Sequence, residues 1–240
     1  MAGKVRLGGD GRRAEKPGQM VVEDVAVSVD AADEYVSRGG VKLANGLDAF
    51  GLEATGRRCL DVGASTGGFT DCLLQRGAEH VVALDVAYGE LHWRLRGDPR
   101  VTVVERSNAR ALSADSLPYQ PDLIVVDVSF ISLTKVLPAV LAAASPDGFD
   151  CLALVKPQFE LGRERVGKGG VVRSPSDRQE ALAGVGSFVG SELGLSVLGF
   201  ASSGLPGPAG NRESFVWIRP AGDVRAARMD IAAAAREADS

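Results

Sequence analysis

The stretch RCLDVGASTGGF at residues 58–69 decides the fold. It begins with a short apolar run, passes through a turn rich in glycine, and continues into an apolar pattern that is typical of a helix. A strand, a glycine turn and a helix in that order let the backbone approach a nucleotide-like ligand at the carboxyl edge of a parallel sheet. A tight strand-to-helix turn without a ligand is the alternative interpretation.

The spacing of the glycines narrows the choice of ligand. They fall at Gly63, Gly67 and Gly68, which is not the G-x-G-x-x-G of dinucleotide sites, and no G-K-[ST] of a P-loop follows. An acidic residue, Asp61, precedes the G-x-x-x-G turn and suits a ligand that has an ammonium group and no phosphate, such as S-adenosyl-L-methionine. Asp85, after the next strand, can accept both hydroxyls of a ribose, and Asn108 can hydrogen-bond an adenine edge.

The rest of the chain alternates strands with helices. Apolar runs bounded by turn signals predict seven strands, at 58–62, 80–86, 101–104, 123–128, 151–155, 196–200 and 214–218. Helical spacing predicts helices at 41–50, 69–76, 133–144 and 176–193. Continuous apolar strands imply a mostly parallel sheet that is covered on both faces. We therefore expect an α/β, Rossmann-like, seven-stranded sheet with helices on both faces.

Composition excludes several classes of protein. The 240 residues carry 27 Lys and Arg against 31 Asp and Glu, so a generally basic nucleic-acid coat is excluded, although a local basic patch is not. The three cysteines Cys59, Cys72 and Cys151 have no C-x-x-C spacing, and with two histidines they predict neither a disulfide framework nor a metal site. No apolar run approaches the roughly 20 residues of a membrane span, so we expect a soluble, cytoplasmic protein.

Four charged residues lie at the ends of predicted elements: Lys42, Asp127, Lys156 and Glu213. Asp127 and Lys156 close two predicted strands, whose carboxyl ends meet at the same edge of a parallel sheet. We therefore expect them to lie near each other and near the glycine turn. A lysine placed there can act as a general base toward an alcohol. An ion pair that merely caps the strand ends is the alternative.

Five strings together resemble the TlyA (hemolysin A) family of FtsJ-like ribose 2′-O-methyltransferases. They are SRGGVKL at 37–43, DVGASTGGF at 61–69, VDVSFISL at 126–133, LVKPQFE at 154–160 and GNRES at 210–214. The resemblance covers roughly residues 35–220, and two of these strings, VDVSFISL and VKPQFE, are highly specific.

The resemblance implies an activity and a set of site residues. It implies methyl transfer from S-adenosyl-L-methionine to a ribose 2′-hydroxyl, of cytidine, in ribosomal RNA, without a metal. It assigns a catalytic Lys-Asp-Lys-Glu tetrad to Lys42, Asp127, Lys156 and Glu213. The predicted cofactor-binding residues are Asp61, Gly63, Ala64, Ser65, Gly67, Phe69, Asp85, Asn108 and Asp127.

Basic residues at two places predict contacts with RNA. They are Lys4, Arg6, Arg12, Arg13, Arg38, Arg163, Arg165 and Lys168. Residues 1–34 resemble part of an S4-type RNA-binding domain without its two helices, and we expect either a start at an internal methionine or a truncated chain. Residues 35–220 form the expected methyltransferase domain, and residues 221–240 an exposed helix or a frayed tail.

Two alternatives come from other classes of protein. The hemolysin name would mean a membrane-active protein, which the absence of a membrane span and of a cationic amphipathic helix opposes. A non-catalytic RNA-binding or ribosome-assembly factor would have no need of all four tetrad residues. We expect a monomer.

Overall fold

The computed structural model describes residues 5–9, 11–16, 18–29, 34–222 and 230–239. The chain divides into two compact units, Met1–Glu34 and Tyr35–Ser240, and each is described here by itself. Among the described residues, no helix is both long enough and apolar enough to cross a membrane.

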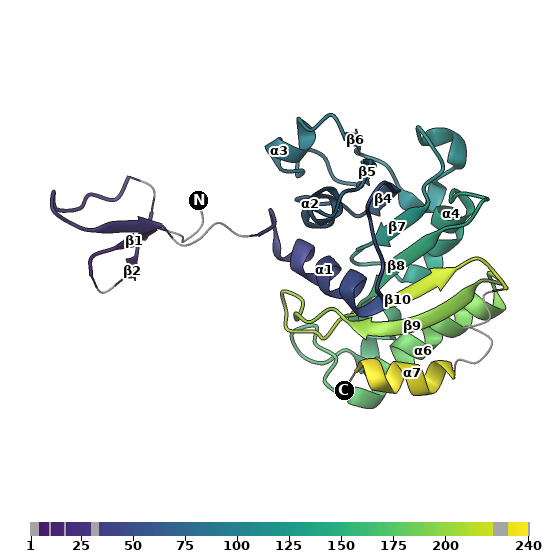
Figure 1. The fold of residues 1–240 in the computed structure, drawn as a ribbon. Coiled ribbons are helices and arrows are strands. Elements are labelled where there is room, and N and C mark those ends of the chain that lie inside the picture. The colour runs from purple at the N-terminus through teal and green to yellow at the C-terminus, as the bar shows by residue number, and fades with distance from the viewer. Residues whose placement is uncertain (1–4, 10, 17, 30–33, 223–229, 240) are drawn as a thin grey trace. The chain divides into compact units, whose positions relative to one another are not determined.

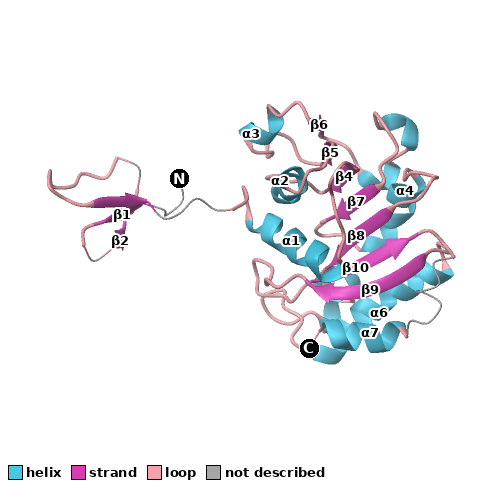
Figure 2. Cartoon of the chain, in the orientation of Figure 1, coloured by secondary structure: helices cyan, strands magenta, loops and turns pink. Residues whose placement is uncertain are grey.

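The larger unit is built on a seven-stranded sheet in the order β6-β5-β4-β7-β8-β10-β9 (Figure 2). The strands β4 to β8 pair in parallel, whereas β10 is antiparallel to both of its neighbours. This confirms the expected α/β class. The bounds are β4 Arg58–Val62, β5 His80–Leu84, β6 Val101–Val104, β7 Leu123–Val126, β8 Asp150–Val155, β9 Ser196–Ser202 and β10 Ser214–Arg219.

Helices cover both faces of this sheet, and each face has its own apolar core (Figure 1). One face packs against α1 Arg38–Phe50, α2 Gly68–Gln75 and α3 Trp93–Arg96. The other packs against η1 Ala109–Ala111, η2 Ala114–Ser116, η3 Leu133–Lys135, α4 Leu137–Ala142, α6 Pro175–Ser191 and α7 Ile231–Ala238. The short elements α5 Pro157–Glu160 and η4 Arg163–Arg165 follow β8.

Among the parallel strands, the strand order reverses between β4 and β7. From β4 the chain runs outward through β5 and β6, then returns to add β7 on the other side of β4. Crossovers leaving a sheet in opposite directions open a crevice at the carboxyl ends of the two strands concerned. The glycine turn after β4 and Asp127 after β7 therefore lie at that crevice.

Several elements differ from their predicted bounds. The helix predicted at 133–144 is split into η3 and α4, with Pro138 in the first turn of α4. A proline nitrogen has no hydrogen and blocks a helix from continuing through it, so it fits the start of a helix and not its middle. The helix expected in the C-terminal region is present as α7, but it is packed rather than fully exposed, because it buries Ala235 completely against the core.

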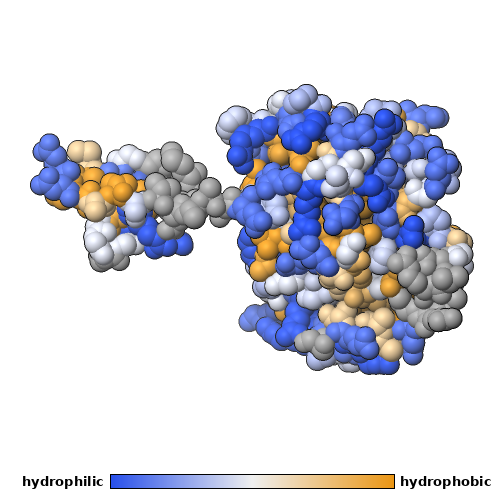
Figure 3. Space-filling view, viewed as in Figure 1, coloured by the Kyte–Doolittle hydropathy of each residue, from blue (hydrophilic) through white to orange (hydrophobic). Residues whose placement is uncertain are grey.

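The N-terminal unit forms a small antiparallel sheet in the order β2-β1-β3, with β1 Val5–Leu7, β2 Arg12–Arg13 and β3 Val27–Val29. Val21 and Val22 lie outside these strands. Apolar residues reach the surface of this unit (Figure 3), where Met20 is 93% exposed and Val22 is 74% exposed.

Two helical glycines give a matched test of the packing. A Cβ on Gly46 in α1 would overlap the ring of Phe215, which is fully buried, whereas a Cβ on Gly184 in α6 would meet nothing within 4 Å. We expect Gly46→Ala to lower the free energy of unfolding by about 1–3 kcal/mol through overpacking. Gly184→Ala should raise it by up to about 1 kcal/mol, because alanine favours the helix. Urea unfolding checks both, and equal effects of the two changes would contradict the packing of α1 on β10.

Candidate active site

The glycine turn after β4 is a position that only glycine fits. Gly63 has φ +86°, and a Cβ there would collide with the backbone carbonyl oxygen of Asp127 at the end of β7. The Gly63 N–H donates to the Leu84 carbonyl at 2.8 Å, and the Asp127 N–H donates to the Val62 carbonyl at 2.9 Å. The turn is thus fixed between the ends of β5 and β7, with its backbone exposed to the crevice.

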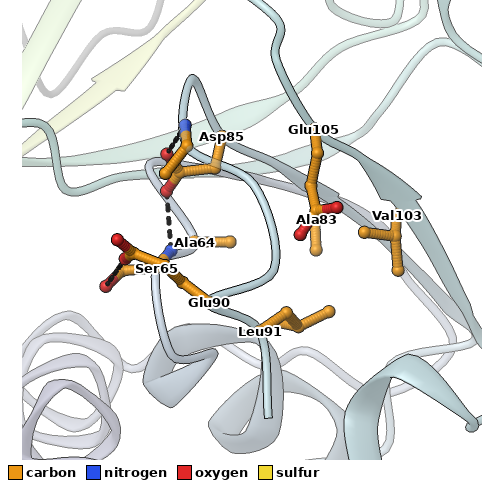
Figure 4. A pocket seen from close by; sticks show the side chains of 9 residues that line it. Ala64, Ser65, Ala83, Asp85, Glu90, Leu91, Val103 and Glu105 are labelled. Carbon is orange, nitrogen blue, oxygen red and sulfur yellow. Dashed lines mark hydrogen bonds between the residues drawn. The ribbon is translucent and has the colours of Figure 1, made fainter. Parts of the chain in front are cut away.

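Asp85, directly after β5, holds the next residues of this turn (Figure 4). One carboxylate oxygen accepts the Ser65 N–H at 2.7 Å, and the other accepts the Ala87 N–H at 2.8 Å. These bonds support Ser65 at φ +47°, a strained value for a residue with a side chain. Each oxygen retains a second lone pair, so Asp85 can still accept a hydroxyl of a ligand.

Asp61 lies in β4, two residues before Gly63, and is completely buried. Its Oδ2 accepts a hydrogen bond from Thr70 Oγ1 at 2.6 Å, while its Oδ1 has no hydrogen-bond partner among the described residues. Burial raises the pKa of Asp61 to about 7, and the nearby carboxylates of Asp127 and Asp85 act in the same direction. Asp61 is therefore a carboxyl group whose charge changes close to neutral pH.

The second predicted pair lies at the ends of β7 and β8. Lys156 Nζ is 2.6 Å from Asp127 Oδ1 and donates to Ser129 Oγ at 2.9 Å. The Lys156 side chain is 10% exposed and that of Asp127 is 24% exposed, so the ion pair is mostly buried and reaches solvent mainly through Asp127. The structure thus brings Asp127 and Lys156 together beside the glycine turn.

Lys42 and Glu213 form a second, more deeply buried ion pair. Lys42 Nζ is 2.5 Å from Glu213 Oε2, and the side chains are 9% and 2% exposed. In the antiparallel register of β8 and β10, Val155 faces Ser214, so the next position places Lys156 across from Glu213. The two ion pairs consequently share one edge of the sheet.

A loop at residues 203–213 carries Glu213 and is held by contacts that the sequence did not indicate. Asn211 is 1% exposed, and its amide accepts the Val172 N–H at 2.9 Å and donates to the Gly170 carbonyl at 2.8 Å. Its own carbonyl accepts the Gly207 N–H, and Gly207 packs so tightly on the Glu213 carboxylate that a Cβ would overlap it. Asn211 therefore joins the glycine-rich loop at 167–172 to the loop that positions Glu213.

An open groove runs along this edge, and several of the predicted cofactor-binding residues line it. It is lined by Gly63, Ser65, Asp85, Asn108 and Asp127, together with Ser129, Phe130, Gln158, Phe159 and Arg163. Ala64 lines a smaller neighbouring pocket with Asp85, Glu90 and Leu91 (Figure 4). The lining residues follow the ends of five strands, β4 to β8, which makes the groove a candidate cleft for a ligand of nucleotide size.

Other predicted cofactor residues contribute differently. Phe69 is 3% exposed, and its ring lies 5.9 Å from that of Phe215, so it is a core residue beneath the turn. Gly67 has φ +95°, and its missing side chain makes room for Leu91 and Leu95. Asn108 caps η1, since its Oδ1 accepts the Arg110 N–H at 3.1 Å.

The predicted RNA-binding residues are spread over both units. Lys4 lies outside the described residues. Arg163 lines the groove, and Arg12 and Arg13 are exposed on β2. Three others have protein partners: Arg6 donates to Gly11, Arg38 donates to the Pro206 carbonyl of the Glu213 loop, and Arg165 pairs with Asp177 and Glu180 of α6. Lys168 lies on the surface of the glycine-rich loop.

Sequence reasoning missed Ser129, Asn211 and Glu90. Ser129 could have been found, because the parallel register of β7 and β8 extends to place it beside Lys156. Glu90, whose Oε2 accepts from Ser65 Oγ at 3.2 Å, and Asn211 lie in loops, where strand periodicity gives no signal. Within the described part of the chain, no three His, Cys, Asp or Glu side chains are grouped to hold a metal ion.

The raised pKa of Asp61 predicts how stability depends on pH without cofactor. The folded protein binds a proton at Asp61 up to about pH 7, whereas the unfolded chain releases it near pH 4. Asp61 should therefore make the free energy of unfolding fall as pH rises from 4 to 7, by about 1.4 kcal/mol for each unit of the raised pKa. Asp61→Asn should remove this component, and Asp115→Asn, at an exposed carboxylate, should not. Urea unfolding at pH 4 to 8 measures both, and parallel curves for the wild type and Asp61→Asn would contradict the burial.

Comparison with known proteins identifies the group to which this arrangement belongs. The model of the FtsJ-like methyltransferase family matches residues 35–219. The chain is 52% identical to the 16S/23S rRNA (cytidine-2′-O)-methyltransferase TlyA of Mycobacterium tuberculosis, over 91% of this chain and 81% of the relative. It is 41% identical to Hemolysin A of Brachyspira hyodysenteriae, over 75% of each chain.

Solved structures agree with the sequence comparison. A structure from Streptococcus thermophilus that is named as a hemolysin superposes with a TM-score of 0.80 at 38% identity, covering 99% of this chain and 86% of the other. A methyltransferase from Burkholderia thailandensis with bound S-adenosylhomocysteine has a TM-score of 0.51 at 18% identity, covers 79% of this chain and 80% of the other, and shares the fold alone. The family model spans the whole sheet and both ion pairs, and the chain belongs to the FtsJ-like methyltransferase family.

Proposed function

We propose that this chain methylates a ribose 2′-hydroxyl, of cytidine, in ribosomal RNA. The observation that carries the proposal is the pair of Lys156 with Asp127, at 2.6 Å, beside a glycine turn whose backbone faces the same groove. The relative from Mycobacterium tuberculosis that is named as an rRNA cytidine-2′-O-methyltransferase supports the choice of substrate.

The residues at the turn fit S-adenosyl-L-methionine, the methyl donor of the family. Gly63 provides a cradle that any Cβ would close, and Asp61 Oδ1 is a buried acceptor without a partner among the described residues. Asp85 and Asn108 line the groove after β5 and β6, where a carboxylate and an amide suit a ribose and an adenine. Gly63, Ser65, Asp85 and Asn108 would hold the cofactor, with Asp61, Gly67 and Phe69 supporting the turn from below.

The chemistry needs an acceptor for one proton. When bound, S-adenosyl-L-methionine would supply a methyl group on its sulfonium. The bond from that methyl group to sulfur would break, with its electron pair left on sulfur, as the ribose oxygen bonds the methyl group and releases its hydroxyl proton. Lys156 Nζ, when uncharged, accepts that proton and becomes an ammonium that Asp127 Oδ1 stabilises. Ser129 Oγ fixes the direction of the amine, because Nζ donates to it at 2.9 Å. The Lys42–Glu213 ion pair then supports the same edge of the sheet.

The remaining parts of the proposal concern the partner and its contacts. Arg163 and Lys168 belong to the loop after β8 and would contact phosphates at the rim of the groove. Arg6, Arg12 and Arg13 of the Met1–Glu34 unit, which resembles part of an S4-type domain, would add contacts outside the target site. We propose that the protein works as a monomer in the cytoplasm.

The proposal predicts the effect of removing the amine. Lys156→Ala should lower the rate of methyl transfer to ribosomal RNA by at least about 10²-fold, the range of general-base catalysis, because no other group takes the proton. Binding of S-adenosyl-L-methionine should change little, since Lys156 does not line the turn. Tritiated-methyl transfer to deproteinised rRNA and to ribosomal subunits measures the rate, and isothermal titration measures the affinity.

Lys135→Ala is the matched control, since Lys135 lines the same groove outside the tetrad. It should retain the wild-type rate at saturating RNA. A Lys156→Ala enzyme with wild-type turnover would remove Lys156 from the mechanism. A wild-type protein that binds the cofactor but methylates neither form of rRNA would contradict the proposed substrate.

A further inference from the structure

Two large aromatic side chains are exposed beside the groove and have no role in the site described so far. Tyr88 is 67% exposed and Trp93 is 76% exposed, with Val86 at 73% in the same segment. Single exposed apolar residues are common, but a group of them with two aromatics marks a contact surface. Both lie between β5 and β6, on the segment that follows Asp85.

This segment is firmly placed relative to the glycine turn. Leu91 and Leu95 are 6% and 5% exposed and occupy the space that a side chain on Gly67 would fill. The His92 N–H donates to the Thr66 carbonyl at 3.2 Å, and the Gly89 N–H donates to Glu105 at 2.8 Å. Figure 4 shows Glu90 and Leu91 of this segment at the same small pocket as Ser65 and Asp85. The backbone that carries the two aromatics is therefore held next to the glycine turn.

The surface also carries cationic groups. The Arg106 guanidinium carbon lies 4.3 Å from the centre of the Tyr88 ring, and Arg106 is held at φ +55° by its N–H bond to the Ala87 carbonyl at 3.2 Å. Arg94 and Arg110 are exposed nearby, and in the described part of the chain none of these three arginines forms an ion pair. Ser107, Asn108 and Arg110, which follow Arg106, line the groove itself.

Aromatic rings beside unpaired arginines are the chemistry that single-stranded RNA requires. Bases stack on the ring faces and on guanidinium planes, and the cations neutralise phosphates. Tyrosine, tryptophan and arginine are also common in protein–protein contacts. The continuity of this surface with a groove that is proposed to take a ribose favours RNA over a protein partner.

We propose that Tyr88, Trp93 and Arg106 form a stacking surface for unpaired bases of the RNA that flank the methylated nucleotide. This inference rests on the proposed function, because it places the rest of the substrate strand beside the target ribose. Tyr88 would take a base on the ring face that Arg106 leaves open, and Trp93 would take another at the outer end of the segment.

The chain contains a built-in reporter for this contact. Of its two tryptophans, Trp93 is exposed, whereas Trp217 is 8% exposed and donates from Nε1 to Asp150 at 2.9 Å. A base that stacks on Trp93 should quench the fluorescence of Trp93 and leave that of Trp217 unchanged. The experiment titrates the full chain, saturated with S-adenosylhomocysteine, with a short unstructured oligoribonucleotide and with an abasic oligomer of equal length.

We expect quenching by the oligoribonucleotide and none by the abasic oligomer. Trp93→Phe should abolish the quenching and keep the affinity, measured by anisotropy of a labelled oligomer, because a ring remains. Trp93→Ala and Tyr88→Ala should each weaken binding on the order of tenfold. Arg106→Ala should weaken it as well. Arg58→Ala is its control, since Arg58 lies over the Tyr119 ring at 5.6 Å at the start of β4, the amino edge of the sheet.

The outcomes separate this inference from the proposed function. Unchanged affinity in Trp93→Ala and Tyr88→Ala, with wild-type methylation of rRNA, would overturn the stacking surface alone. Weaker binding of these variants to intact ribosomal subunits but not to any free RNA would overturn it in favour of a protein partner. Quenching by RNA in a wild-type protein that methylates no rRNA would support the surface and contradict the proposed function.

Discussion

The close contact between the glycine turn and the end of β7 is the constraint on which the site depends. Gly63 touches the Asp127 carbonyl where any side chain would collide, and the backbone bonds of Gly63 and Asp127 reach to β5 and β4. This contact sits where the strand order reverses, so it fixes the crevice and the first member of the Asp127–Lys156 pair together. If a side chain at position 63 pushed the ends of β4 and β7 apart, the turn would lose its support. Asp127 would then move away from Lys156.

The sheet and the paired charges followed from the sequence, whereas the loops did not. Buried parallel strands are continuous apolar runs, so the seven strands could be located within one or two residues at most ends, and the carboxyl ends could be expected to collect Asp127 and Lys156. The helix predicted at 133–144 failed at Pro138 because periodicity ignores the missing N–H. The role of Asn211 depends on two loops that meet across 39 and 41 residues of sequence, a contact that local patterns cannot indicate.

The edge of the sheet carries two ion pairs, one of them almost fully buried, and this has a physical consequence. Removing an ion pair from water costs free energy that the attraction of the pair often fails to recover, so these pairs are poor contributors to stability. Lys42 and Glu213 are nevertheless almost fully buried, and Gly207 closes the carboxylate off on one side. Such a pair keeps its geometry because separating it would leave an unpaired charge in the interior. Its position across from Lys156 therefore gives a rigid support to the edge of the sheet that carries the Asp127–Lys156 pair.

Gly67 links the glycine turn to the segment that carries the exposed aromatics. Its missing side chain lets Leu91 and Leu95 pack directly over the turn, and those two residues bracket Trp93. A shift of the turn would thus move α3 and the exposed aromatics with it, because both share one packed contact and interiors are close-packed rather than fluid. The glycine turn and the segment that carries the proposed stacking surface should consequently move together. An RNA strand bound on Trp93 and Tyr88 would be aligned with the same backbone that is proposed to position the methyl donor, as the orientation of two reactants requires.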